Sequence, residues 1–370
     1  MTDLYIGLMS GTSLDGVDGV LVDLTRSRPL AVLAHRHVAF AADLSRELLA
    51  LNSPGDNELH RAALAGNALA RIYACVVQAL LDDSATAASQ IRAIGAHGQT
   101  VRHRPHEFDA TGYTLQLGNP ALLAELAGID VIADLRSRDV AAGGQGAPLV
   151  PAFHRAVFGR AGHSVAVLNL GGIANLTALH ADGTTTGFDC GPGNALMDLW
   201  CLAHTGQPFD MSGAWAATGS VNAAMLAAML AEPYFERPAP KSTGRDLFHA
   251  EWLAAHQHQH RGLQPPDVQA TLAELTARSC ADAVRRHAGA AQELLVCGGG
   301  SLNRHLMQRL ANALPGVQVR PTDTRGLPAM QVEACAFAWL AQAFCERECA
   351  NLSAVTGAVG PRRLGALYPA

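Results

Sequence analysis

Residues 4–24, LYIGLMSGTSLDGVDGVLVDL, decide the fold. Two apolar, strand-like runs flank a loop rich in Gly, Ser, Thr and Asp, which is the pattern of a β-hairpin. A third apolar run begins at residue 30, apolar residues recur at helical spacing over 57–81, and a short strand, AIGAHG, ends at His97. The first part of the chain therefore predicts the order β-β-β-α-β.

The same order returns about 160 residues later. Residues 163–191, HSVAVLNLGGIANLTALHADGTTTGFDCG, again read as strand, glycine loop, strand, turn and strand. Helices are predicted near Asn194 and over 220–232, 246–260 and 267–287, and the short strand ELLVCGGG follows them. We predict two α/β domains of related topology with a ligand cleft between them.

The boundary between these domains is expected in AAGGQGAPLVP, residues 141–151. The prediction is an N-terminal domain over 1–145 and a C-terminal domain over 146–370. A helix at about 331–346 is expected to pack back on the first domain.

Composition excludes several classes of protein. The chain has 370 residues, of which 49% are apolar, so it is not disordered throughout. The net charge of −5 gives no basic field for a nucleic-acid backbone. No apolar run approaches the ~18 residues of a membrane span, and the N-terminus has no basic stretch typical of a signal peptide. We expect neither a nucleic-acid partner nor a membrane.

Lys241 is the single lysine beside 26 arginines, and it lies in a proline-rich stretch. No Gly-Lys pair exists, so a Walker A loop is excluded, as is the strand lysine of a protein kinase. The eight cysteines form no C-x-x-C pair, which predicts reduced thiols in the cytoplasm. The HQHQH run, 256–260, is either a metal site or a solvated helix end, and the second is favoured.

Three glycine turns stand at predicted strand ends: residues 10–16, 171–175 and 298–301. Glycine lets a ligand approach backbone N–H groups closely. Without a Walker lysine, two hairpin loops could hold a polyphosphate by backbone amides, and the third run could present a helix N-terminus.

Carboxylates accompany two of these turns. Asp15 and Asp18 lie in or beside the first; Asp15 is equally suited to hold Mg²⁺ or to close the turn through an Asx bond. Asp189 follows a strand and precedes a helix, where it suits a general base. The alternative for Asp189 is a helix N-cap, but Asn194 is the better cap.

Polar clusters on predicted loops include Gln99, Thr100, Arg136 and Arg138. The two arginines could bind a carboxylate or phosphate, or pair with neighbouring aspartates. Glu333, on a helix that is otherwise apolar, is either solvated or part of a site.

The sequence resembles the anhydro-N-acetylmuramic acid kinase family over residues 5–369. The resemblance is carried by these segments: GLMSGTSLDGVDGVLVD, AHGQTVRHRP, ADLRSRDVAAGGQGAPLVPAFH, LNLGGIANLT, GFDCGPGNALMD, PKSTGRDLF, CGGGSLNRHLM and GAVGPRRLGALYP. It implies two ribonuclease-H-like domains of the sugar-kinase, heat-shock and actin ATPase superfamily, with an ATP and sugar cleft between them.

The resemblance also implies a reaction and a homodimer. ATP and water would convert 1,6-anhydro-N-acetylmuramic acid, a small sugar, into N-acetylmuramic acid 6-phosphate and ADP. Asp189 would be the base that activates water. The implied ATP-binding residues are Gly11, Thr12, Ser13, Leu14, Asp15, Gly16, Val17, Asp18, Gly171, Gly172, Asn175, Gly298, Gly299 and Gly300, with Asp15 also the candidate Mg²⁺ ligand. The implied substrate-binding residues are Gln99, Thr100, Arg136 and Glu333.

Two positions depart from the family pattern: Cys190 stands where Thr is usual, and Leu135 where Phe is expected. Other functions also remain open. These are a kinase of another sugar, an ATP-binding switch without a phosphorylated product, and a two-carboxylate glycosidase that needs no ATP.

Overall fold

The computed structural model describes residues 3–11, 13–27, 29–244 and 247–370, which form two compact units. Unit 1 runs to Phe153 and includes Gln331–Ala370, and unit 2 is His154–Met330. The division thus falls eight residues beyond the expected 145/146 boundary. Residues 347–370 group with unit 1, whereas the sequence predicted them as part of the C-terminal domain, 146–370. The reason is a C-terminal strand that joins the first sheet.

Unit 1 is built on a six-stranded sheet in the order β13-β7-β4-β1-β2-β3. β1, β2 and β3 form an antiparallel meander, and β4 and β7 run parallel to β1. A separate hairpin pairs β5 with β6. The strands are β1 (Leu4–Met9), β2 (Gly16–Asp23), β3 (Ala31–Ala39), β4 (Ile91–Ala96), β5 (Gln99–Pro105), β6 (Gly112–Leu117), β7 (Val131–Ala133) and β13 (Ala366–Tyr368).

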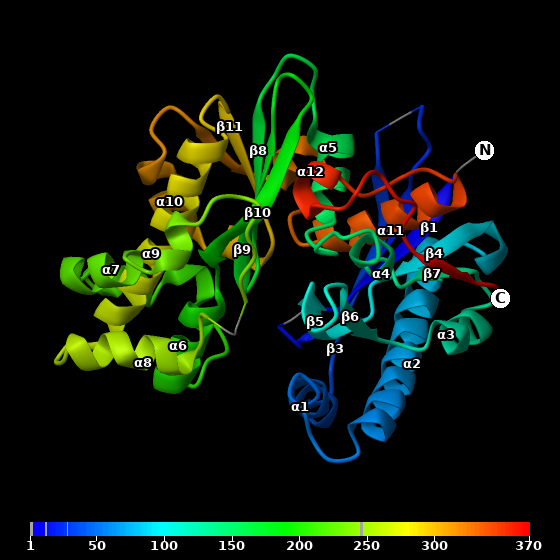
Figure 1. Ribbon diagram of the computed structural model, residues 1–370, viewed down its shortest axis with the longest axis horizontal. Helices are drawn as coiled ribbons and strands as arrows, with labels where there is room; N and C mark the ends of the chain where they lie inside the picture. Colours follow the sequence, from blue (N-terminus) through cyan, green and yellow to red (C-terminus); the bar gives the residue numbers. More distant parts are fainter. Residues whose placement is uncertain (1–2, 12, 28, 245–246) are drawn as a thin grey trace. The chain divides into compact units, whose positions relative to one another are not determined.

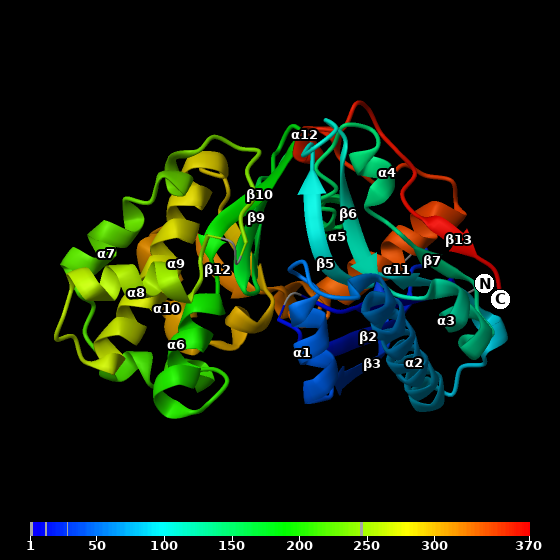
Figure 2. The same ribbon diagram turned by 60° about the horizontal axis from the view of Figure 1, so that its bottom comes forward.

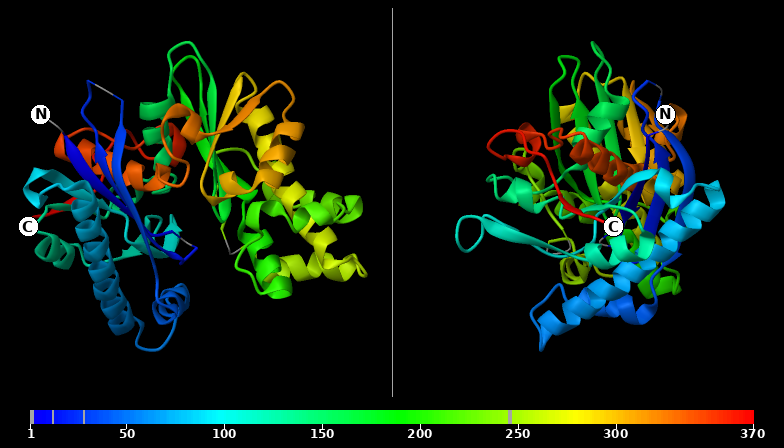
Figure 3. Two further views of the ribbon diagram at one scale, coloured as in Figure 1. Left: turned by 180° about the vertical axis from the view of Figure 1, so that it is seen from behind. Right: turned by 90° about the vertical axis from the view of Figure 1, so that its right-hand side faces the viewer.

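Helices cover both faces of this sheet. The helices are α1 (Ala42–Ala50), α2 (Glu58–Ser84), α3 (Pro120–Ala127), α4 (Ser137–Val140), α5 (Val150–Phe158), which crosses the division, α11 (Val332–Cys345) and α12 (Ser353–Thr356). α11 lies along β1 and β4, and α2 lies along β2 and β3 (Figures 1 and 3). Successive strand residues face opposite sides. Gly7 faces α11, while Leu8 and its partner Gly19 lie with Val76 of α2.

Close contact between α11 and the sheet depends on two glycines. A Cβ on Gly7 would lie 1.9 Å from the carbonyl oxygen of Ala334, and one on Gly95 would lie 2.0 Å from that of Phe337. The backbone of α11, the helix expected at about 331–346, therefore lies directly against the backbone of β1 and β4, with no side chain between them at these two glycines. This contact sets the position of Glu333 in the first turn of α11.

By length and hydropathy alone, α2 could cross a membrane. Half of its apolar window is buried within the protein. Leu69, Val76 and Leu80 belong to the core of unit 1, so packing against the sheet accounts for the apolar character of this helix.

Unit 2 repeats the sheet order of unit 1. Its five strands run β10-β9-β8-β11-β12; β8, β9 and β10 form an antiparallel meander, and β11 and β12 run parallel to β8. The strands are β8 (Val165–Leu170), β9 (Ile173–Leu179), β10 (Thr185–Pro192), β11 (Glu293–Cys297) and β12 (Gln318–Pro321). The matching order in both units confirms the predicted duplication and the ribonuclease-H-like topology.

The helices of unit 2 are α6 (Ala195–Thr205), α7 (Ala223–Leu230), α8 (Ala250–Gln259), α9 (Pro265–His287) and α10 (Arg304–Ala313). α9 packs on β9 and β10 and contacts α6, α7 and α10 (Figure 2). Its buried side chains, with those of β8 and β11, form the core of this unit.

Replacing Gly7 with Ala should lower the free energy of unfolding by about 3 kcal/mol, because the new methyl group meets helix backbone that cannot move aside alone. Chemical denaturation followed by circular dichroism measures the loss. The control is Gly118→Ala, where the nearest atom to the new Cβ is 3.9 Å away. Equal stability of the two variants would contradict the close packing of α11.

Candidate functional site

The first glycine turn joins β1 to β2 and is fixed at its base. The buried Ser10 hydroxyl donates to the carbonyl of Gly98 at 3.0 Å and lies 3.0 Å from the hydroxyl of Tyr73. Gln99 Nε2 donates to the carbonyl of Gly11, also at 3.0 Å. The residues that follow β4, Gly98 and Gln99, therefore hold the start of the loop that follows β1. Of its predicted ATP-binding residues, Thr12 lies outside the described residues.

The two carboxylates in and beside this turn, Asp15 and Asp18, differ in exposure and in hydrogen-bond partners. Asp15 is exposed and accepts a 2.7 Å hydrogen bond from the Ser13 hydroxyl. Asp18, on β2, is 3.2 Å from both His35 and His37 of β3. Gly16 and Val17 are buried in the strand, and Leu14 adopts a positive φ of 58°. Asp15 is thus the carboxylate of the loop with a solvent-facing oxygen.

Within the described ranges, no three His, Cys, Asp or Glu side chains are grouped so as to bind a metal. Mg²⁺ commonly takes one or two protein carboxylates and completes its shell with phosphate oxygens and water. The exposed carboxylate of Asp15 fits that mode.

Arg136 is tied to the first turn through His97. Its Nη2 donates to His97 Nε2 at 2.9 Å, and its Nη1 donates to the carbonyl of Gly146 at 2.8 Å. Burial lowers the pKa of His97 to about 3, so the ring is neutral and its Nδ1–H donates to the carbonyl of Ser10 at 3.1 Å. Burial lowers the pKa of Arg136 to about 10, and Glu333 favours its charged form. Among the described residues these contacts hold the guanidinium. The alternative, an ion pair with Asp134 or Asp139, does not form in this part of the structure, although the charge of Asp139 also favours the protonated guanidinium.

The other predicted substrate residues border the same loops. Gln99 is buried, and its Oε1 has no hydrogen-bond partner among the described residues. Thr100 is the second residue of β5, and its hydroxyl accepts from Nε2 of Gln116 in β6 at 3.2 Å. Glu333 reaches Arg136 electrostatically from α11. The structure therefore brings Gln99, Arg136 and Glu333 to the carboxyl ends of the strands of unit 1.

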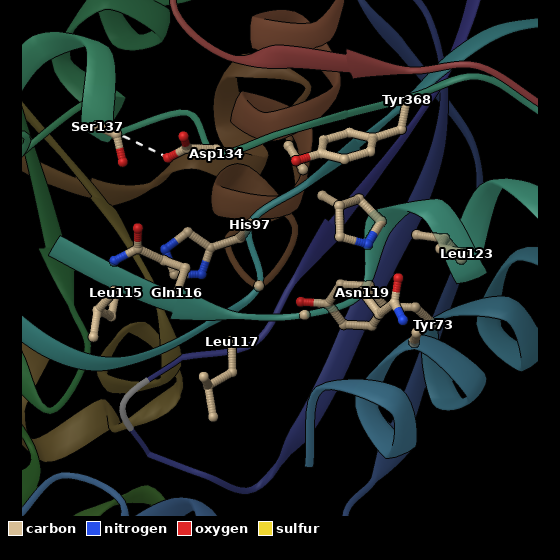
Figure 4. Close-up of a pocket in the computed structure, with 16 residues that line it drawn as sticks. Tyr73, His97, Leu115, Gln116, Leu117, Asn119, Leu123, Asp134, Ser137 and Tyr368 are labelled. Carbon is tan, nitrogen blue, oxygen red and sulfur yellow. Dashed lines mark hydrogen bonds between the residues drawn. The ribbon is translucent and has the colours of Figure 1, made fainter. Parts of the chain in front are cut away.

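A pocket of about 300 Å³ lies beside these residues in unit 1 (Figure 4). Its wall includes His97, Tyr73 and Tyr368. It also includes Asp134 and Ser137, where the backbone N–H of Ser137 donates to Oδ1 of Asp134 at 3.3 Å. None of the predicted substrate-binding residues lines it. It is adjacent to them, because His97 and Asp134 precede Gln99 and Arg136 closely in the chain.

In unit 2, the glycine turns after β8 and β11 pack against each other. The carbonyl of Gly171 accepts from the backbone N–H of Asn194, and that of Gly172 accepts from Gly193 and Ala195. A Cβ on Gly300 would lie 2.5 Å from the Cβ of Leu170. Gly298 and Gly299 belong to the same strand-end turn. Asn194 occupies the N-cap of α6, but its side chain donates to the carbonyl of Leu170 instead of capping.

Asp189 lies inside β10, three residues before the strand ends at Pro192 and directly opposite Asn175 of β9. The sequence placed it after the strand, but the pairing of β10 with β9 continues past it. A β-bulge follows, because Asp189 pairs with Asn175 while Gly191 pairs with Ala174, leaving Cys190 as the extra residue. Cys190 is buried in the core, where the hydrogen bond with Cys280 and burial raise the pKa of its thiol. The departure from the family pattern at this position is therefore a core substitution.

Two hydrogen bonds from one segment, 234–243, hold Asp189. The N–H of Thr243 donates to its Oδ2 at 3.1 Å, and the hydroxyl of Tyr234 donates to its carbonyl at 2.7 Å. Poor solvation raises the pKa of the Asp189 carboxyl to about 7, although the Thr243 bond opposes that shift. The side chain keeps a partly accessible surface. A carboxylate of this kind can take a proton from water near neutral pH.

Comparison with known proteins identifies the family. The sequence model of the family "Anhydro-N-acetylmuramic acid kinase" matches residues 3–370. The chain belongs to the anhydro-N-acetylmuramic acid kinase family.

Two relatives with that name illustrate the likeness. One from Variovorax paradoxus (strain S110) is 62% identical over all of this chain and 99% of its own; one from Albidiferax ferrireducens is 59% identical over both whole chains. Among solved structures, the activator of the 2-hydroxyisocaproyl-CoA dehydratase from Clostridium difficile with bound ADPNP aligns over 94% of this chain and 96% of its own, at 13% identity and a TM-score of 0.47. That last likeness has no bearing on function.

Several residues around the family's motifs were not predicted as part of the site. His97, Tyr234 and Thr243 each hold a predicted residue in place. His97 and Thr243 lie inside two of the segments that carried the family resemblance, AHGQTVRHRP and PKSTGRDLF. Those two segments could have drawn attention to His97 and Thr243. Their hydrogen-bond partners, Ser10 and Asp189, are far away in the sequence, so the sequence could not show the contacts.

Asp189→Asn should become more stable relative to the wild type as pH rises from 4 to 8. Ionising Asp189 costs the folded protein stability between its unfolded pKa of 3.8 and its folded pKa of about 7. About three pKa units correspond to about 4 kcal/mol at most, and residual solvent contact lowers that value. Thermal unfolding at several pH values should show a gain of more than about 1 kcal/mol.

A control variant is Asp182→Asn, in the turn before β10, where hydrogen bonds from Thr184 lower the pKa of the aspartate. Its stability relative to the wild type should change with pH in the opposite sense. A pH-independent difference for Asp189→Asn would show that Asp189 is an ordinary solvated carboxylate.

Proposed function

We propose that the chain uses ATP and water to convert 1,6-anhydro-N-acetylmuramic acid into N-acetylmuramic acid 6-phosphate and ADP, a step in the recycling of cell-wall sugar. Membership of the kinase family over residues 3–370 supports the activity. The observation in the structure that carries the proposal is Asp189, a carboxylate at the bulge in β10 with a pKa of about 7, near the glycine turns of unit 2.

The chemistry needs one base and one phosphoryl transfer. Asp189 takes a proton from water, whose oxygen bonds to the anomeric carbon. The bond from that carbon to O6 breaks, O6 bonds to the γ-phosphorus, and ADP leaves. Positioning and charge neutralisation account for most catalysis of phosphoryl transfer, so a protein without a Walker lysine can perform it.

ATP is the phosphoryl donor in this proposal. In unit 1 the predicted contacts are the residues of the first turn, Gly11 to Asp18, and in unit 2 they are Gly171, Gly172, Asn175 and Gly298–Gly300. Gly299 is exposed, and the nearest atom to a Cβ built on it is Asn194 Nδ2 at 3.9 Å, which supports a backbone surface that a ligand can approach. Asp15 would hold Mg²⁺, which would neutralise phosphate charge.

Arg136 and Glu333 are proposed for the sugar side, with Gln99 and Thr100. The unpartnered Oε1 of Gln99 supports this role, because a sugar hydroxyl would satisfy a buried acceptor. The Arg136 guanidinium suits the lactyl carboxylate of the substrate.

Location and assembly belong to the same proposal. All eight cysteines are free thiols in the structure, which supports a reducing compartment such as the cytoplasm. A homodimer is proposed from the family resemblance.

The test is ADP release with 1,6-anhydro-N-acetylmuramic acid in ¹⁸O-labelled water. One heavy oxygen should enter each product molecule, at the anomeric position, because solvent water opens the bridge. Mass analysis of the sugar product measures it. Asp189→Asn should lose about 10²-fold or more of the rate, while its folding is checked by circular dichroism.

Other outcomes identify the alternatives. ADP release without the anhydro sugar indicates an ATPase switch, and phosphorylation of a plain hexosamine without heavy oxygen indicates another sugar kinase. Sugar opening without ATP indicates a glycosidase. Each of these results contradicts the proposed function.

A further inference from the structure

Lys241 makes its contacts inside unit 2. Its Nζ donates to the carbonyls of Tyr234 and Phe235, at 3.1 Å and 3.0 Å, and lies 4.7 Å from the centroid of the Tyr234 ring. These carbonyls belong to a short 3₁₀ helix, η4 (Pro233–Glu236). The ammonium therefore caps that helix and joins the two ends of the segment 234–243.

Both ends of this segment also hold Asp189. Tyr234 donates its hydroxyl to the carbonyl of Asp189 at 2.7 Å. The backbone N–H of Asp189 donates to the carbonyl of Lys241 at 3.1 Å, and two residues later Thr243 reaches Oδ2. The backbone and the carboxylate of Asp189 are thus fixed by a segment that Lys241 closes.

We propose that Lys241 is a positioning residue for Asp189: its ammonium closes the segment 234–243, and the closed segment aims the carboxylate of Asp189. This inference rests on the proposed function, in which Asp189 is the base. Lys241 touches neither reacting atoms nor phosphate in this role.

The surroundings explain why a cation with a slender stem occupies the position. Lys241 lies beside Phe188 and Phe235 in a small pocket and is half-buried, and burial lowers its pKa. A compact ammonium can donate to two neighbouring carbonyls while its stem packs on rings, whereas the guanidinium of arginine is a wider, planar fork. Lys241 is the single lysine of the chain, beside 26 arginines, so the one position occupied by lysine is one where a compact ammonium fits better than a guanidinium. Without the ammonium, the carbonyl of Tyr234 loses this donor, and the carbonyl of Phe235 keeps only a long 3.4 Å hydrogen bond from Nη1 of Arg286.

The experiment compares Lys241→Met with the wild type. Methionine keeps apolar volume and removes both hydrogen bonds. We expect kcat for the anhydro sugar to fall between about tenfold and a hundredfold, the cost of a base displaced by about 1 Å. KM for ATP should stay within about twofold, and calorimetry with AMPPNP should show the same number of nucleotide sites. Lys241→Arg should recover part of kcat, because it can donate to the same carbonyls.

The matched control is Arg286→Met, which removes a cation from the same pocket. Arg286 pairs with Glu236 at the surface and makes no contact with Asp189 among the described residues. It also donates to the carbonyl of Phe235, but this bond is exposed and long, at 3.4 Å. Its kcat should remain within about twofold of the wild type. If Lys241→Met is too unstable to measure, Tyr234→Phe deletes only the hydroxyl bond to Asp189 and should lower kcat by about threefold or more, in line with the worth of one hydrogen bond.

A double variant separates positioning from general stability. If Lys241 acts through Asp189, Lys241→Met should cause no further loss in the Asp189→Asn background. An equal loss in both backgrounds, or a kcat for Lys241→Met within twofold of the wild type, overturns the inference. Full activity of Asp189→Asn instead overturns the assignment of the base, so the two failures are distinguishable.

Discussion

The proposed chemistry of unit 2 depends on holding the carboxylate of Asp189 where water solvates it poorly. Asp189 lies inside β10, beside the buried Cys190 and close to Gly191 with its positive φ, and Thr243 of the segment 234–243 donates to its Oδ2. Poor solvation raises the pKa of the carboxyl, and one backbone hydrogen bond keeps it from rising further. The bulge, the Tyr234 hydroxyl and the Thr243 N–H all serve to keep this acid in one orientation.

Glycine is the second recurring constraint. In unit 1, Gly7 and Gly95 let α11 lie directly on the sheet, which carries Glu333 toward Arg136. In unit 2, Gly300 lets the turn after β11 approach the end of β8. Both units place their glycine turns at the carboxyl ends of parallel strands, where α/β folds bind ligands. Backbone amides at these ends can do what a Walker lysine does elsewhere.

Local patterns in the sequence were enough to predict much of the fold. The first hairpin, the helix near 57–81, the long helix of unit 2 and the repeated strand order are all confirmed. The hairpin of β5 and β6 joins neighbouring segments and was missed because β5, QTVRHRP, is mostly polar. The edge strand β13 was missed because its partner β7 lies far away in the sequence. The same reason moved residues 347–370 into unit 1.

The site was predicted less completely. Asp189, Gln99 and Arg136 were named, but the links that position them join residues far apart in sequence: Asp189 to Thr243, and Arg136 through His97 to Ser10. Spacing alone cannot show such contacts. The roles of the ATP-binding and substrate-binding residues remain predictions that ligand-bound experiments will test.

The most direct test of this account is the pKa of Asp189 itself. Protein labelled with ¹³C at aspartate carboxyl carbons can be titrated by NMR, and the signal absent from Asp189→Asn identifies the residue. The account predicts a midpoint near 7 for that signal. A midpoint near 4, the value of a solvated aspartate, would contradict it.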